Sequence, residues 1–114
     1  MRFSGVVQKG SGTGESLGFP TANIPLTDET LSGIYAARAF FGGGEYFAAV
    51  YADTKRKLLE AHILNFNDDL YGMEIEIELV KKMRDDRQFI DEADAKKAIA
   101  LDIEAIEAYL RRVN

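Results

Sequence analysis

The segment Leu17-Gly18-Phe19-Pro20-Thr21-Ala22-Asn23-Ile24 is the stretch around which the fold is expected to form. Proline lacks a backbone donor, fixes its own φ and keeps the preceding residue out of the helical region, so the chain after Pro20 is expected to be extended. Alternate side chains of an extended segment share a face, which places Thr21 and Asn23 on the same side. A hydroxyl and an amide carbonyl are oxygen donors that suit a hard cation such as magnesium, so this pair is a candidate metal site.

A glycine-rich loop, Gly10-Ser11-Gly12-Thr13-Gly14, lies just before this segment. Glycines let a backbone approach another group closely, and the amides of such a loop can form a concavity that accepts an anion. The same composition is also typical of a hairpin turn. The loop does not match the Walker pattern, since no Gly-Lys-Ser/Thr follows, or the dinucleotide fingerprint, whose glycine spacing differs. Combined with residues 20–23, it predicts a phosphate cradle followed by a metal site.

Composition and charge exclude several classes of protein. The 114 residues fit one domain over residues 1–114, and the absence of cysteine excludes disulfides and thiolate metal sites. A net charge of −5 argues against binding nucleic acid through general electrostatics. No apolar stretch approaches the roughly 18 residues of a membrane span, so neither a span nor a signal peptide is predicted. A cytoplasmic protein with no membrane partner is expected.

Period-two patterns and β-branched residues predict strands at residues 3–8, 34–41, 46–51, 58–64 and 73–80. Gly42-Gly43-Gly44 is expected to turn the chain tightly between the second and third of these strands. Residues 52–57 are expected to be a polar connection with three consecutive basic side chains, Lys55, Arg56 and Lys57. The last strand alternates most clearly, and these side chains are expected to point inward: Met73, Ile75, Ile77 and Leu79.

From Asp91 onward the hydrophobic period becomes helical. The expected buried stripe is Ile99, Ile103, Ile106 and Leu110. Acidic residues near the start and Arg111-Arg112 near the end complement the helix dipole. Several strands followed by one helix predict an all-β or small α+β fold with antiparallel neighbours. Closure into a small barrel would remove the exposed sheet edges.

Glu60 is the most informative acidic residue because it lies inside a predicted strand among Leu58, Leu59 and Ala61. A carboxylate in such surroundings needs a partner or a chemical role. One interpretation is an outward-facing residue on a sheet edge. The other is a general base that takes a proton from an attacking hydroxyl. His62 shares its face, but a lone histidine is more often structural, and no chemistry is assigned to it.

Two further segments carry aromatic and basic side chains. Residues 68–72 are typical of a turn, from which Tyr71 can offer an aromatic face to a ring. Residues 83–89 are either a solvated charged loop or a site for a planar polar ligand. The second interpretation uses Arg84, Arg87 and Phe89, since a guanidinium both stacks and donates in a fork.

In their order and spacing these segments resemble the riboflavin kinase (flavokinase) family. The resemblance runs from the glycine loop to the terminal helix with Asp102, through Pro20-Thr21-Ala22-Asn23, Ser32-Gly33-Ile34-Tyr35, Leu59-Glu60-Ala61-His62-Ile63-Leu64, Asp69-Leu70-Tyr71-Gly72 and residues 83–89. It implies a six-stranded antiparallel Greek-key barrel with a C-terminal helix. It also implies magnesium-dependent transfer of the γ-phosphoryl group of ATP to the 5′-hydroxyl of riboflavin, giving FMN and ADP.

The resemblance also implies roles for individual residues. Glu60 resembles the catalytic base, and Thr21 and Asn23 resemble the magnesium and phosphate ligands. The implied nucleotide contacts are Gly10, Gly12, Gly14, Thr21, Ile63, Asn65 and Tyr71. The implied flavin contacts are Arg84, Arg87 and Phe89.

The chain departs from the family pattern in three places. Ala52-Asp53-Thr54 is all that remains of a longer connection that usually contains an Asn/Arg-Pro-Thr/Tyr element, Arg84-Asp85-Asp86 replaces Arg-Pro-Glu, and Thr13 replaces a common arginine. Many bacterial members are fused to an adenylyltransferase domain; no such domain is seen in this sequence, and a monofunctional, monomeric kinase is expected. The alternative is a non-catalytic barrel that binds flavin or nucleotide for regulation, favoured by the shortened connection.

Overall fold

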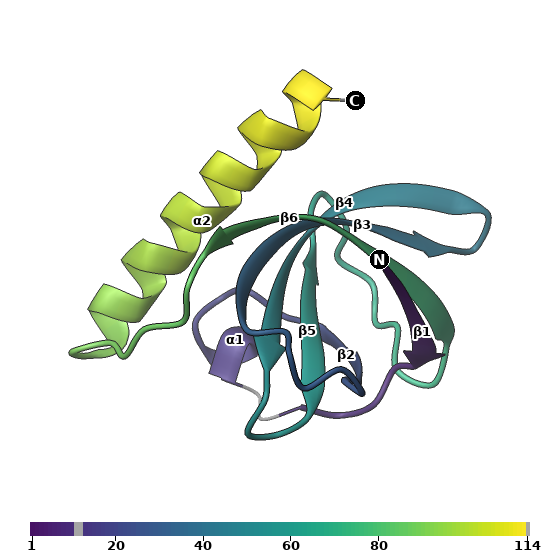
Figure 1. Cartoon of the computed structure of the whole chain (residues 1–114), viewed down its shortest axis with the longest axis horizontal. Helices are drawn as coiled ribbons and strands as arrows, with labels where there is room; N and C mark the ends of the chain where they lie inside the picture. The colour runs from purple at the N-terminus through teal and green to yellow at the C-terminus, as the bar shows by residue number, and fades with distance from the viewer. Residues whose placement is uncertain (11–12, 114) are drawn as a thin grey trace.

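The computed structural model describes residues 1–10 and 13–113. In chain order the elements are β1 (Arg2–Val6), α1 (Thr13–Ser16), β2 (Ala22–Pro25), β3 (Gly33–Phe41), β4 (Gly44–Asp53), β5 (Leu58–Ile63), β6 (Glu74–Arg84) and α2 (Glu92–Val113). Figure 1 shows the strands forming a strongly curved sheet, with α2 lying outside it. This is the six-stranded architecture with one C-terminal helix that the sequence predicts.

The strands form one antiparallel six-stranded sheet in the order β1-β6-β3-β4-β5-β2. Strands β3, β4 and β5 follow one another as neighbours, and β6 returns beside β3, which is the Greek-key arrangement. The two ends of the sheet meet where the Gln8 N–H donates to the Asn23 carbonyl at 2.8 Å. The predicted barrel is therefore confirmed, and it is nearly closed.

The barrel interior holds the main hydrophobic core. Its largest fully buried side chains are Ile24, Val50, Leu59, Ile75 and Ile77. Both faces of β5 are covered, because Leu58 through Ala61 are all buried. Glu60 is thus buried in the strand and is not an exposed edge residue, which removes one of its two interpretations.

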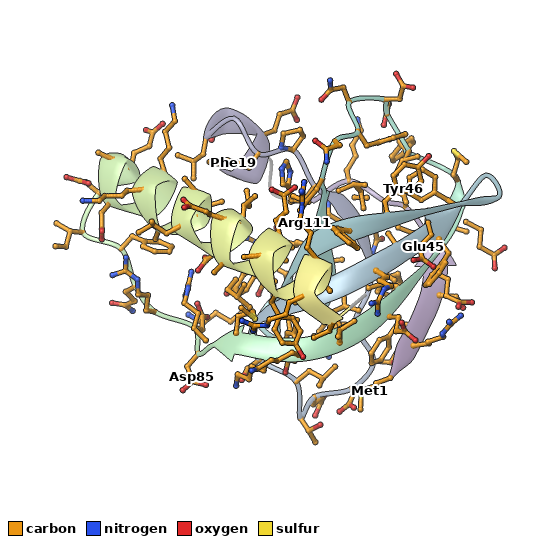
Figure 2. The ribbon with its side chains drawn as sticks, turned by 90° about the horizontal axis from the view of Figure 1, so that it is seen from above. Met1, Phe19, Glu45, Tyr46, Asp85 and Arg111 are labelled. Carbon is orange, nitrogen blue, oxygen red and sulfur yellow. The ribbon has the colours of Figure 1, made fainter. Side chains whose placement is uncertain are left out.

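Helix α2 packs against the outer face of the sheet. Its Ile106 and Leu110 form a second, smaller hydrophobic cluster with Ala36 of β3. Figure 2, seen from above, shows the helix lying across the strands. Asp91 caps its start, since the Asp91 carboxylate accepts from the Asp94 N–H at 2.8 Å. Of the predicted stripe, Ile106 and Leu110 are fully buried.

The rest of that stripe is corrected by the structure. Ile99 and Ile103 are only half-buried, and Ala95 and Ala98 take the buried positions in the first half of the helix. Ile99 and Ile103 instead line a cavity between the helix and the sheet. No helix in the described part of the chain is long and apolar enough to cross a membrane.

Ile106→Ala is expected to lower the free energy of unfolding by about 2–5 kcal/mol, because Ile106 has no exposed surface and truncation leaves a cavity under α2. Urea unfolding followed by circular dichroism measures this loss. Leu101→Ala, on the exposed side of the same helix, is the matched control and is expected to change stability by less than about 0.5 kcal/mol. Equal losses in both variants would contradict the packing described for α2.

Several predicted boundaries are also corrected. The first strand ends at Val6 and not Gln8; β4 continues to Asp53 and β6 to Arg84, beyond the predicted ends. Met73 precedes β6 and is exposed, so it is not a core residue, while Ile75, Ile77 and Leu79 are buried as predicted. The hairpin is confirmed, with Gly42 and Gly43 at φ of 57° and 76°, the left-handed region that glycine adopts without strain.

Candidate active site

The pairing of β2 with β5 brings the predicted chemistry together. Asn23 lies directly opposite Glu60 in this antiparallel pair, so the two side chains share a face. The Thr21 hydroxyl donates to the Asn23 amide oxygen at 3.2 Å. Asn23 and Glu60 are both buried, at 5% and 8% exposure. The oxygen-bearing side chains of Thr21, Asn23 and Glu60 therefore lie together, although Glu60 is far from the other two in the sequence.

The start of the glycine loop lies against Asn23. A Cβ added at Gly10 would meet the Asn23 Nδ2 atom at 2.5 Å, so a side chain there would displace the Asn23 amide. The Asn23 amide also donates to the carbonyls of Gln8 and Thr21 at 3.5 Å each, which holds its oxygen in place. Gly14 lies in α1, and the prediction for Gly12 falls outside the described residues.

A cleft of about 760 Å³, here called the glycine-loop cleft, opens beside this pair. Of the predicted nucleotide contacts, it is lined by Gly10, Thr21, Ile63 and Tyr71. Gly14 is not among the lining residues, and Asn65 is exposed in the turn after β5, at φ of 57°, and does not line the cleft either. The sequence missed Phe66, Asn67 and Leu70, which continue the lining beyond β5.

A second cavity of about 560 Å³, here called the helix-side cavity, lies between the sheet and α2. The predicted flavin contacts all line it, namely Arg84, Arg87 and Phe89. Glu60 and His62 face this cavity, whereas Ala61 and Ile63 line the glycine-loop cleft, so the two spaces lie on opposite faces of β5. Thr21 lines both and marks where they meet.

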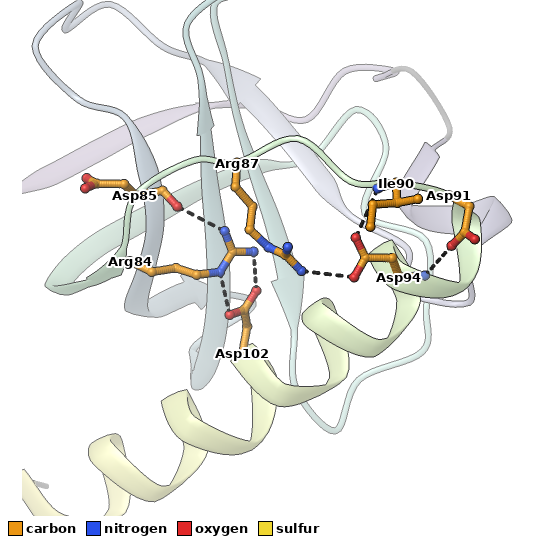
Figure 3. A network of polar contacts seen from close by, with 7 residues as sticks. All are labelled: Arg84, Asp85, Arg87, Ile90, Asp91, Asp94 and Asp102. Carbon is orange, nitrogen blue, oxygen red and sulfur yellow. Dashed lines mark hydrogen bonds and ion pairs between the residues drawn. The ribbon is translucent and has the colours of Figure 1, made fainter.

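Two of the three arginines that line the helix-side cavity, Arg84 and Arg87, are held by carboxylates of α2 (Figure 3). Arg84 donates to both oxygens of Asp102, from Nε at 2.8 Å and from Nη2 at 2.7 Å. Arg87 reaches Asp94 at 3.3 Å, and its guanidinium lies 4.8 Å from the centre of the Phe89 ring. A bidentate pair with Asp102 uses much of the donor capacity of Arg84, so Arg84 joins the end of β6 to α2 as well as lining the cavity.

Asp53 is the most important residue that sequence reasoning missed. It is 4% exposed and adjoins Glu60. Burial first, and then the hydrogen bond and negative charge of Asp53, raise the pKa of Glu60 to about 7, while the positive charge of Arg56 opposes the rise. A signal was present, because an aspartate at a strand end commonly accepts hydrogen bonds from the following turn. It was overlooked because the strand was predicted to end at Tyr51.

Two other contacts support the site from outside. His62 Nδ1 lies 2.8 Å from the Pro20 carbonyl, which ties β5 to the segment before β2 and fits the structural role expected for this residue. The Tyr51 hydroxyl donates to Asp86 at 2.8 Å; burial, followed by this bond, raises the pKa of Tyr51. Tyr51 is therefore a neutral donor that fastens residues 85–91 across the helix-side cavity.

The oxygens of Thr21 and Asn23 fit a shared magnesium ion. Adjacent ligands of an octahedral ion with bonds of 2.0–2.1 Å lie about 3.0 Å apart, close to the 3.2 Å between these two atoms. In the described ranges no three His, Cys, Asp or Glu side chains gather around a metal position. The remaining ligands would then be water and substrate phosphates, which is the usual arrangement for magnesium.

Comparison with known proteins agrees with the resemblance inferred from the sequence. The family model of flavokinase, described as riboflavin kinase, matches residues 1–110. The chain belongs to the riboflavin kinase family. The resemblance inferred from the sequence segments is thereby confirmed.

Curated relatives in this family are longer proteins. A bifunctional riboflavin kinase/FMN adenylyltransferase from Haemophilus influenzae is 34% identical over 95% of the chain, and the chain spans 38% of its length. Relatives of the same description from Escherichia coli K12 and Bacillus subtilis are 35% and 32% identical over 88% and 76% of the chain, which spans 35% and 31% of their lengths.

The fold is also found among solved structures. A crystal structure described as a macrolide-efflux protein from Streptococcus pneumoniae superposes with a TM-score of 0.79 at 25% identity. The match covers 93% of this chain and 38% of that one. The family model thus supports membership of the riboflavin kinase family, and the solved structure independently supports the barrel fold.

Proposed function

We propose that this chain is a riboflavin kinase, which transfers the γ-phosphoryl group of ATP to the 5′-hydroxyl of riboflavin with magnesium. The observation that carries the proposal is the meeting of two cavities at Thr21, beside the buried Glu60 carboxyl and the Asn23 amide. Phosphoryl transfer requires a donor and an acceptor held in line beside a charge-neutralising group. Two separate spaces that meet beside the Thr21 and Asn23 oxygens, where a magnesium ion would be held, support this arrangement.

The cavities differ in ways that suit the two substrates. The glycine-loop cleft offers Tyr71 and Ile63 to a nucleobase and the backbone at Gly10 to phosphates. The helix-side cavity offers Phe89 and the guanidinium of Arg87 to a planar ring system. We therefore place ATP in the cleft and riboflavin in the helix-side cavity.

In the proposed reaction Glu60 accepts the proton of the 5′-hydroxyl. The new bond joins this oxygen to the γ-phosphorus while the bond from phosphorus to the β,γ-bridging oxygen breaks, and ADP leaves. A pKa of about 7 suits a base that operates near neutrality. Thr21 and Asn23 would hold a magnesium ion, whose chemistry is to neutralise charge on the phosphates.

The test is the formation of FMN from riboflavin, ATP and magnesium, separated by chromatography and detected by flavin fluorescence. The expected result is turnover that requires both the nucleotide and the divalent cation. Absence of FMN with every nucleoside triphosphate and with either magnesium or manganese would overturn the enzymatic proposal.

A second candidate is a barrel that binds flavin or nucleotide without turnover. The short connection between β4 and β5, from Asp53 to Leu58, favours it, since less chain is available to cover the flavin. Calorimetry distinguishes the two: tight binding of riboflavin without FMN production selects the binding module.

A further inference from the structure

The turn between β4 and β5 carries three basic residues that the proposed function has not yet used: Lys55, Arg56 and Lys57. The turn is built on Asp53, whose Oδ1 accepts from the N–H groups of both Lys55 and Arg56 at 3.1 Å. Lys57 closes it with a φ of 57°. Because Asp53 is almost fully buried, this fixes the backbone from which the basic side chains project.

Arg56 projects toward the base. Arg56 and Lys55 line the helix-side cavity together with Glu60, whereas Lys57 does not. The Arg56 guanidinium lies 3.4 Å from the second oxygen of Asp53, the residue that adjoins Glu60. Its side chain is 54% exposed, so this single contact leaves donors available to another group.

The other two arginines of the helix-side cavity each make more than one such contact. Arg84 gives two bonds to Asp102, and Arg87 is paired with Asp94 and also lies 4.8 Å from the centre of the Phe89 ring. The Lys55 ammonium forms no ion pair with a described residue, but it lacks the planar fork of a guanidinium. Arg56 is therefore the described guanidinium of this cavity that is best placed to bind a new anion.

The glycine-loop cleft, by contrast, is poor in positive charge. Among its described lining residues, Lys9 is the one cation, against the carboxylates of Glu15, Asp68 and Asp69. A phosphoryl group at the junction of the two cavities would find its compensating side-chain charge on the helix-side, at the basic turn.

We propose that Arg56 binds the transferred phosphoryl group from the flavin side, during transfer and in the product FMN. A guanidinium presents two parallel donors that match two phosphate oxygens, and an arginine on the transferring group is a large contributor to phosphoryl transfer in other enzymes. The assignment to a phosphate rests on the proposed function. It predicts that this protein distinguishes FMN from riboflavin through Arg56.

Equilibrium binding of FMN and of riboflavin, followed by quenching of flavin fluorescence, tests the proposal without requiring turnover. Arg56→Ala is expected to weaken FMN binding at least tenfold while changing riboflavin binding less than twofold. Arg56→Lys, which keeps the charge but not the fork, is expected to give an intermediate loss for FMN alone. Lys57→Ala is the matched control in the same turn, outside the cavity, and is expected to bind both ligands as the unmodified protein does.

Each other outcome separates this proposal from the kinase proposal. If Arg56→Ala weakens the binding of FMN and of riboflavin equally, Arg56 only shapes the cavity, and the proposed phosphate contact is overturned. Unchanged FMN binding, or an unmodified protein that binds FMN no more tightly than riboflavin, would also overturn it, even if turnover is normal. An Arg56-dependent preference for FMN in a protein that makes no FMN would support Arg56 as a phosphate contact and contradict the kinase proposal.

Discussion

Glu60→Gln is expected to lower kcat for FMN formation by about 10²–10⁴-fold, the usual contribution of a positioned general base. Glutamine has nearly the same shape as glutamate, but it cannot accept the proton of the attacking hydroxyl. Steady-state assays with saturating riboflavin and ATP measure the loss. Because the change falls on the chemical step, the KM for each substrate is expected to change much less than kcat.

The pH dependence provides an internal control for this variant. Glu60 must be unprotonated to act as a base, so with a pKa of about 7 the rate of the unmodified protein is expected to fall below neutral pH. The residual rate of Glu60→Gln is expected to lack that fall. A variant that retains most of its activity, or that keeps the same pH profile, would show that Glu60 is not the base.

Unfolding of the variant cannot account for the expected loss. The pKa of Glu60 is raised above its ordinary value of 4.5, so its contribution to stability is greatest when it is protonated and is lost as pH rises through about 7. Glutamine stays neutral at every pH. Glu60→Gln is therefore expected to be at least as stable as the unmodified protein at pH 8, which a thermal melt can verify.

Thr21→Val is expected to produce the second-largest effect, a rise of at least about tenfold in the magnesium concentration needed for half-maximal activity. Valine keeps the branched shape of threonine but removes the hydroxyl that lies 3.2 Å from the Asn23 oxygen. Activity measured across a magnesium titration separates this effect from a general loss of rate.

Thr21→Ser is the control, because it retains the hydroxyl and is expected to follow the magnesium curve of the unmodified protein closely. If Thr21→Val needs no more magnesium than the unmodified protein, the hydroxyl is not a ligand. Its place between the two cavities would then serve packing alone.

The local patterns of this sequence predicted antiparallel strands that could close into a barrel, and the family resemblance predicted the six-stranded barrel and the shared site of its polar residues. Pro20 forces an extended start, and the resulting strand pairs with β5 so that Asn23 faces Glu60. The family resemblance supplied the pairing partner, which a period-two pattern cannot give. Residues of one strand share a face by local geometry, but the register between strands depends on the whole fold.

What the sequence could not give depends on contacts between distant segments. Asp53 looks like part of a solvated turn until β4 is seen to continue to it beside Glu60. Arg84 looks free to bind a ligand until α2 brings Asp102 against it, 18 positions later. Met73 satisfies the alternation of its strand but lies just before the strand begins, where the chain is exposed. In each case tertiary packing overrides a correct local pattern.

The position of Thr21 at the junction of two spaces on opposite faces of β5 has a consequence for how the reaction is organised. In the proposed arrangement donor and acceptor occupy different cavities, so each can arrive or depart while the other stays in place. The proposed chemistry then proceeds in a ternary complex by direct displacement, without a phosphorylated form of the protein. In this arrangement β5 separates the two cavities, and the transferred phosphoryl group would pass from one to the other beside Thr21.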